Sequence, residues 1–101
     1  MARSIFKFPY NSPEKSQNIV HNILVSNGYR QSIENNEVVW EKGSVWLTGK
    51  RCIKVEFGTN ELIVSGWIDS GFSETQLSGF GGSYAKGKII KVIEQIKLSI
   101  F

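Results

Sequence analysis

Two alternating apolar segments joined by a short turn constrain the fold of this chain more than any other feature of its sequence. In CIKVEF (Cys52–Phe57) every second side chain is apolar, which is the pattern of a strand with one buried face. Residues 58–60 (GTN) have turn chemistry, and the segment Leu62–Ile68 alternates again. We therefore predict an antiparallel β-hairpin that spans residues 52–68.

Weaker strand signals precede this hairpin. Alternation over Tyr29–Ile33, the pair Asn35-Asn36 and the apolar run Val38–Glu41 indicate a second hairpin with a tight turn. The segment 45–48 (VWLT) is a further candidate strand. The opening RSIFKF, residues 3–8, is interrupted by Pro9, which favours a short edge strand or an extended arm.

Two amphipathic helices flank the predicted strands. Ser12 is a suitable N-cap, Pro13 suits the first helical position and Gly28 suits the helix stop. The second helix is predicted from about Tyr84 to Ile100. The apolar residues recur at helical spacing and form one stripe on each helix: Ile19, Val20, Ile23 and Leu24 on the first, and Ile89, Val92, Ile93, Ile96 and Ile100 on the second.

These elements predict an α+β fold. Strands with one apolar face need a cover, and two amphipathic helices supply it. We expect a two-layer sandwich in which an antiparallel, four- to five-stranded meander is packed by an N-terminal and a C-terminal helix. With 101 residues, the chain is expected to form a single α+β domain over 1–101.

The cellular setting is predicted from what the sequence lacks. Cys52 is the one cysteine, so it has no internal disulfide partner, and a reducing compartment fits best. No apolar run approaches the length of a membrane span, and the opening residues have no apolar signal core. We expect a cytoplasmic protein with no membrane partner. The net charge of +3 favours anionic partners only weakly.

Four segments of the chain resemble a family of short bacterial α+β domains, some of which are attached to a zinc ribbon. The segments are EVVWEKG from Glu37, IKVEF from Ile53, GWI from Gly66 and LSGF from Leu77. The resemblance spans most of the chain and implies the α+β architecture, but it implies no activity. Family members often carry a longer, more apolar segment where this chain has residues 70–76.

The stretch GSYAKGKI, from Gly82 to Ile89, fits the phosphate-loop pattern G-x-x-x-x-G-K except at its last position. Ile89 stands where a Ser or Thr should bind magnesium, and no buried parallel strand precedes the stretch. We therefore interpret it as the Gly-rich entry to the second helix. A weaker alternative is an anion held by backbone amides at residues 81–83, with Lys86 or Lys88 beside them.

Catalytic and metal sites are not predicted. His21 and Cys52 are the only nucleophile or base candidates of the usual types, and nothing in the sequence places them together with an orienting group. One His, one Cys and scattered carboxylates lack metal-ligand spacing. Glu56 and Asp69 lie on neighbouring predicted strands, where a solvated face is the default interpretation. We expect no enzyme activity, no cofactor and no metal.

Aromatic and basic residues suggest two binding surfaces. If two of the three tryptophans share the uncovered face of the sheet, they form an exposed aromatic platform. Lys50, Arg51 and Lys54 form a short basic cluster that the lysines of the last helix could join, and such a cluster could attract nucleic acid. The residues predicted to take part in binding are Trp40, Trp46, Trp67, Phe80, Lys86, Lys88 and Lys91.

The leading functional hypothesis is a noncatalytic interaction module. It contacts another protein, or a second copy of itself, through the exposed sheet face or through the Gly-rich loop 70–82 and the basic helix end. The alternative is a weak anion- or nucleic-acid-binding domain. A third hypothesis is a small-molecule pocket between the sheet and the helices.

Overall fold

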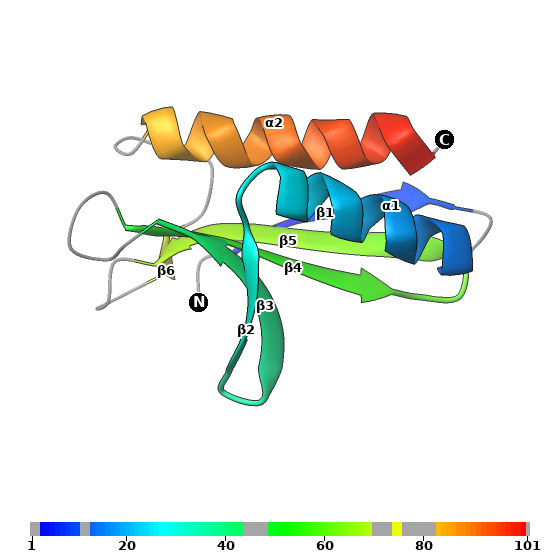
Figure 1. Cartoon of the computed structure of the whole chain (residues 1–101), viewed down its shortest axis with the longest axis horizontal. Coiled ribbons are helices and arrows are strands. Elements are labelled where there is room, and N and C mark those ends of the chain that lie inside the picture. Colours follow the sequence, from blue (N-terminus) through cyan, green and yellow to red (C-terminus); the bar gives the residue numbers. More distant parts are fainter. Residues whose placement is uncertain (1–2, 11–12, 44–48, 70–73, 76–82, 101) are drawn as a thin grey trace.

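A computed structural model describes residues 3–10, 13–43, 49–69, 74–75 and 83–100 of the chain. The elements in chain order are β1 (Ser4–Pro9), α1 (Pro13–Ser26), β2 (Arg30–Glu34), β3 (Glu37–Lys42), β4 (Lys50–Phe57), β5 (Glu61–Asp69), β6 (Glu74–Thr75) and α2 (Ser83–Ile100). Both helices lie over the same face of one antiparallel sheet (Figure 1). The predicted α+β sandwich of two layers is confirmed.

The sheet has the strand order β1-β5-β4-β3-β2, and β6 pairs with the end of β5. Strands β2 to β5 form the predicted meander. In the central hairpin Cys52 pairs with Trp67 and Phe57 pairs with Leu62, so the strongest sequence signal is confirmed. The N-terminal strand β1 crosses to the far side of β5, where Ser4 pairs with Gly66. Strand β2 is therefore an edge of the sheet.

Helix α1 ends in a motif that fixes the chain direction into β2. Gly28 has a φ of +85°, which favours glycine, and its N–H donates to the carbonyl of Val25 over 2.9 Å. The N–H of Tyr29 donates to the carbonyl of Leu24 over 2.9 Å. This pair of bonds is a Schellman motif, in which the residue after glycine packs back on the helix. The predicted stop at Gly28 is thus correct, and it delivers Tyr29 to the core.

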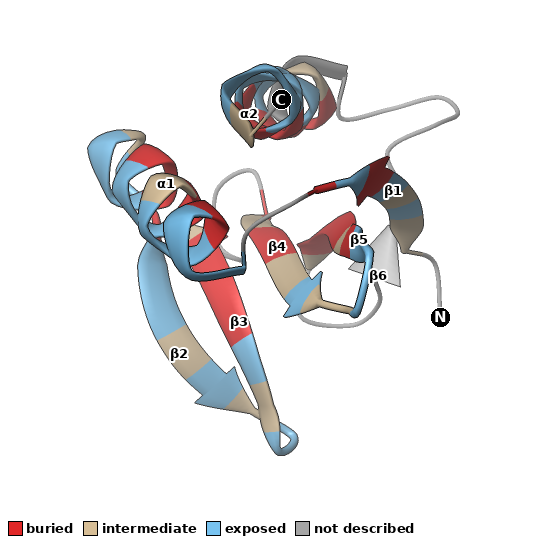
Figure 2. Cartoon of the chain, turned by 90° about the vertical axis from the view of Figure 1, so that its right-hand side faces the viewer, coloured by how far each residue is buried: buried red, intermediate tan, exposed pale blue. Residues whose placement is uncertain are grey.

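The main core lies between the sheet and the two helices (Figure 2). Leu24 of α1 and Ile89 and Ile96 of α2 are fully buried against Ile53 and Leu62 of the sheet. The predicted stripes of both helices face this core, with Ile19 and Ile100 half-buried at its margins. Removing any of the buried aliphatic side chains is expected to cost about 2–5 kcal/mol of stability.

A second, smaller cluster lies on the face of the sheet that the helices do not cover. It consists of Val39, Cys52 and Trp67, each at most 2% exposed. The guanidinium of Arg3 lies 3.7 Å from the centre of the Trp67 ring and covers it. On this face of the sheet, a charged side chain rather than a helix covers the buried tryptophan.

Two predicted segments differ from the structure or lie beyond it. The candidate strand 45–48 lies outside the described residues. The loop predicted over residues 69–82 is wrong at Asp69, which is the last residue of β5, and at Glu74–Thr75, which forms the short strand β6. The rest of this predicted loop lies outside the described residues. A strand of two residues has no periodicity, so the sequence offers no signal for it.

Candidate functional site

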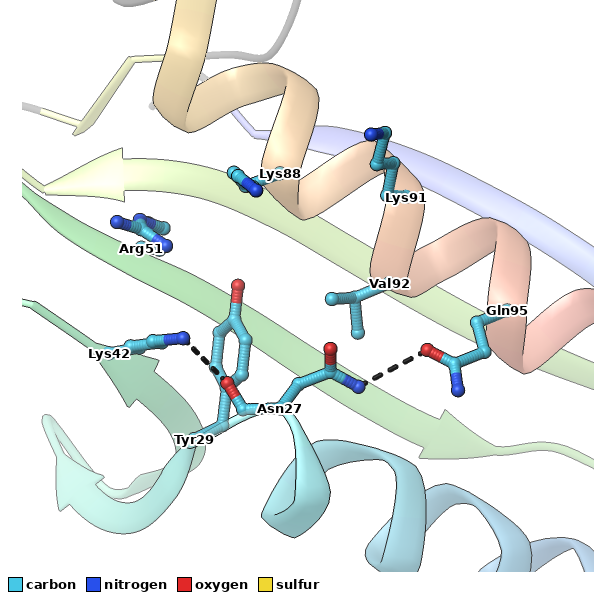
Figure 3. A pocket seen from close by; sticks show the side chains of 8 residues that line it. All are labelled: Asn27, Tyr29, Lys42, Arg51, Lys88, Lys91, Val92 and Gln95. Carbon is cyan, nitrogen blue, oxygen red and sulfur yellow. Dashed lines mark hydrogen bonds between the residues drawn. The ribbon is translucent and has the colours of Figure 1, made fainter.

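A pocket of about 430 Å³ opens between the end of α1, the side of α2 and the strands beneath them. Figure 3 shows the side chains that line it, which come from the turn after α1, from β3 and β4, and from α2. The lining residues are Asn27, Tyr29, Lys42, Arg51, Lys88, Lys91, Val92 and Gln95. Below, this pocket is called the basic pocket.

The charge of the basic pocket is of one sign. Lys42 and Arg51 lie on the sheet side of the pocket, and Lys88 and Lys91 line it from successive turns of α2, with the Lys91 ammonium pointing away from Arg51 (Figure 3). None of the eight described residues of the lining is a carboxylate. Four cations around one small volume raise the local potential, and an anion inside would lower their mutual repulsion.

Tyr29 supplies a hydrogen-bond donor at the floor of the basic pocket. The residue is 5% exposed, and its hydroxyl points toward the space between Arg51 and α2 (Figure 3). Burial raises the pKa of Tyr29 to about 12, although the charge of Arg51 opposes this shift. The phenol therefore keeps its proton at neutral pH. Its oxygen is buried and has no hydrogen-bond partner among the described residues.

Arg51, which lines the same pocket, carries a second unsatisfied donor. Its Nε atom is buried and also lacks a partner among the described residues. A guanidinium N–H donates only, so an acceptor is required to satisfy it. These two buried atoms are the only ones of their kind among the described side chains, and both belong to residues that line the basic pocket. Each unsatisfied group costs about 1–3 kcal/mol, and such groups usually mark a ligand or a bound water.

The opposite wall of the basic pocket is held by hydrogen bonds. The Nζ of Lys42 donates to the backbone carbonyl of Asn27 over 2.7 Å, which satisfies a carbonyl at the end of α1. The side-chain amide of Asn27 donates to Gln95 of α2 over 3.2 Å, so it links the turn after α1 to α2 at the edge of the pocket (Figure 3).

Two of the predicted tryptophans are buried, which contradicts the expected aromatic platform. Trp40 is 8% exposed in the main core, where its ring packs edge-on to that of His21, with 5.3 Å between the ring centres. Trp67 is 2% exposed on the opposite face of the sheet, beneath Arg3. The two rings therefore share neither a face nor access to solvent. Trp46 and Phe80 lie outside the described residues.

The predicted lysines separate into two groups. Lys88 and Lys91 are exposed and line the basic pocket, while Lys86 is 4% exposed and does not line it. The predicted basic cluster also divides, because successive residues of a strand point to opposite faces. Arg51 faces α2, whereas Lys50 and Lys54 lie on the other face.

Lys50 and Lys54 are neutralised by carboxylates on that other face. The Nζ of Lys54 lies 2.9 Å from Glu37 and 3.1 Å from Glu56. The Nζ of Lys50 lies 3.0 Å from Glu34, and it also contacts Glu41 and Asp69. Each ammonium thus has carboxylate partners, so this face offers no concentrated positive charge to an anion.

Other chemistries find no support in the described part of the chain. Burial raises the pKa of Cys52 to about 12, so its thiol stays protonated, and His21 packs against Trp40 rather than beside the thiol. No group of three or more potential metal-ligating side chains occurs among the described residues. None of the helices in that part is long and apolar enough to cross a membrane.

Three of the four cations of the basic pocket were identified from the sequence, but Lys42 and the tyrosine at the floor of the pocket, Tyr29, were not. Lys88, Lys91 and Arg51 stand in visible basic clusters, but Lys42 and Tyr29 read as ordinary residues of a strand. The available signal was Gly28, since a helix that ends in a Schellman motif turns the next residue inward. A comparison of the chain with protein-family models, curated proteins and solved structures gives no match. The family resemblance therefore stays a prediction.

Proposed function

We propose that this domain is a noncatalytic binding module that holds a small oxyanion with more than one negative charge, such as a phosphate group, in the basic pocket. The observation that carries the proposal is the pair of buried, unsatisfied donors on Tyr29 and Arg51. An oxyanion accepts hydrogen bonds from both and is attracted by Lys88 and Lys91.

The pocket favours a phosphate group on a small molecule over a nucleic-acid strand. Binding of a single strand typically needs a charged track with aromatic side chains on which bases stack. Trp40 and Trp67 are buried, and the cations Lys50 and Lys54 face away from the pocket toward carboxylates. The cations that line the pocket surround one compact volume of about 430 Å³ instead.

We propose in addition that the protein is located in the reducing environment of the cytoplasm. Cys52 is a buried free thiol in a well-packed cluster, and it needs neither an oxidising compartment nor a disulfide partner to be stable.

Titration calorimetry with inorganic phosphate and pyrophosphate tests the proposal. Arg51→Gln removes a charged donor and is expected to weaken binding about tenfold or more, because a hydrogen bond to a charged group contributes about 1.5–3 kcal/mol. Tyr29→Phe is expected to weaken binding while the free energy of unfolding stays constant or rises by about 1 kcal/mol, because an unsatisfied hydroxyl is removed.

Lys97→Gln is the matched control. Lys97 lies on α2, as Lys88 and Lys91 of the pocket do, and its replacement changes the net charge as Arg51→Gln does, but Lys97 does not line the basic pocket. If it weakens binding as much as Arg51→Gln, the attraction is a general charge effect and no site exists. The absence of any heat with both anions also refutes the proposal. So does binding of a single-stranded oligonucleotide without binding of either anion.

A further inference from the structure

Strand β2 presents an open edge that fits a second copy of the same strand. It is the last strand in the order β1-β5-β4-β3-β2, and no other described element pairs with its outer side. From the register, charge and burial of this edge, we propose that two copies of the chain associate through antiparallel pairing of their β2 strands around Ser32. This goes beyond the proposed function and does not depend on it.

The turn between β2 and β3 determines which backbone groups of β2 point outward. Asn35 and Asn36 have φ angles of 51° and 65°, as in a two-residue type I′ turn, and Glu34 pairs with Glu37 beside it. The residues that flank such a turn exchange backbone hydrogen bonds with each other, and the pattern alternates along the strand. The N–H and carbonyl groups of Gln31 and Ile33 therefore point away from β3.

A register centred on Ser32 brings these outward groups together. Gln31 of one copy then lies opposite Ile33 of the other, and each such pair exchanges two hydrogen bonds. The same register places Arg30 opposite Glu34 of the second copy, twice by symmetry. Centring the pair on Arg30 or on Glu34 would instead oppose identical charges. Centring it on Gln31 or on Ile33 leaves both charges without an opposite charge across the interface.

The charges of β2 already belong to a chain of ion pairs that the second copy would continue. Glu34 lies 3.0 Å from Lys50, and Arg30, which is largely exposed, lies 3.7 Å from Glu41. In the pair, Glu34 would have Lys50 of its own copy on one side and Arg30 of the second copy on the other. Opposite charges directly across a strand pair are stabilising, and like charges are destabilising.

Apolar side chains on the other face of the hairpin gain cover from the same pairing. Ile33 is 77% exposed and Val38, its partner on β3, is 49% exposed, which leaves an apolar pair in solvent (Figure 2 shows the outer part of the hairpin as largely exposed). In the Ser32-centred register the two copies of Ile33 are diagonal neighbours at about 7–8 Å. Four apolar side chains then share one surface across the joint.

Charge reversal tests the pairing through a mixing experiment. Arg30→Glu and Glu34→Arg each place like charges opposite each other in a homodimer, so each variant alone is expected to associate roughly tenfold more weakly than the wild type. Mixed in equal amounts, the two variants regain opposite charges at both positions and are expected to associate with each other as strongly as the wild type does. Sedimentation velocity from micromolar to millimolar concentration measures all three samples.

Several outcomes would overturn the proposal. These are a wild-type chain that stays monomeric at millimolar concentration, variants that associate like the wild type, and a mixture that stays monomeric while the wild type dimerises. Thermal unfolding of each variant shows that it is folded, and pyrophosphate binding of the monomeric variants shows that the basic pocket is intact. A failure of phosphate binding in the wild type would leave the mixing result unaffected, so the two proposals are separable.

Discussion

Arg3 shows how a single side chain outside any strand completes the smaller core. Its guanidinium covers the ring of Trp67 at 3.7 Å, and both of its terminal nitrogens donate to the carboxylate of Glu37 over 3.1 Å. Such a fork geometry fixes the guanidinium plane over the indole. The ion pair with Glu37 thus holds the Arg3 guanidinium over Trp67. Sequence alone does not reveal this arrangement, because Arg3 and Glu37 are far apart in the chain.

Glu37 makes this contact sensitive to acid. The hydrogen bond from Arg3, with a second from Lys54, lowers the pKa of Glu37 from its ordinary 4.5 to about 2. The folded state therefore binds this proton less readily than the unfolded state. The contribution of Glu37 to stability is complete above pH 4.5 and is lost as the pH falls toward 2. In Glu37→Gln, the free energy of unfolding should fall less steeply across this pH range, as measured by urea unfolding.

Glu94→Gln serves as the control, since Glu94 lies on the exposed side of α2. It should leave the slope of stability against pH close to that of the wild type. A slope for Glu37→Gln that matches the wild type would show that the ion pair with Arg3 does not stabilise the fold.

At the scale of elements, the sequence predicted what local patterns encode and missed what depends on register. The period of two in Cys52–Phe57 and the stop of α1 at Gly28 are each encoded within a single segment, and the structure confirms both. The predicted N-cap Ser12 lies outside the described residues. The sequence of a single strand does not show which face of the sheet the helices cover. The assignment of Trp40 and Trp67 to opposite faces of the sheet was therefore not possible from the sequence. Arg51 and Lys88 line the same pocket only because α2 packs on β4, which is also not visible in the sequence.

The entry to β4 offers a prediction on backbone geometry. Gly49 has a φ of +85°, and an added Cβ would lie 2.7 Å from the Cγ2 atom of Ile68. Gly49→Ala is expected to destabilise the fold by about 1–3 kcal/mol through strain and overpacking. Gly87→Ala in α2 meets no atom within 4 Å and is expected to stabilise by about 0.5–1 kcal/mol. Chemical denaturation of both variants would refute the argument if the signs were equal.

The whole molecule is asymmetric in charge. One face of the sheet interleaves cations with carboxylates, while the described lining of the basic pocket on the helix side contains four cations and no carboxylate. The net charge of +3 conceals this separation, which is why composition alone favoured an anionic partner only weakly. Folding brings Lys42, Arg51 and Lys91 together from three elements. The site therefore exists only at the scale of the complete fold.

Amide hydrogen exchange should map the sheet from its centre to its edge. Strand β5 pairs with β4 on one side and with β1 and β6 on the other, so its amides are expected to exchange most slowly. In dilute protein the outward amides of Gln31 and Ile33 should exchange fastest within β2. Equal protection along β2 would contradict the backbone orientation derived from its turn. Protection of these two amides that rises with concentration would agree with strand pairing.

The pairing of β1 with β5 has a consequence for how a ribosome delivers this chain. Pro9 of β1 pairs with Glu61 of β5, so β1 leaves the exit tunnel long before its partner strand is translated. Meanwhile the local hairpin β2–β3 can form, but Phe6 and Phe8 stay uncovered until β5 is translated. A nascent chain in this state presents an apolar segment of the kind that chaperones bind. The same pairing that gives β5 a neighbour on each side in the finished sheet thus sets a vulnerable interval during translation.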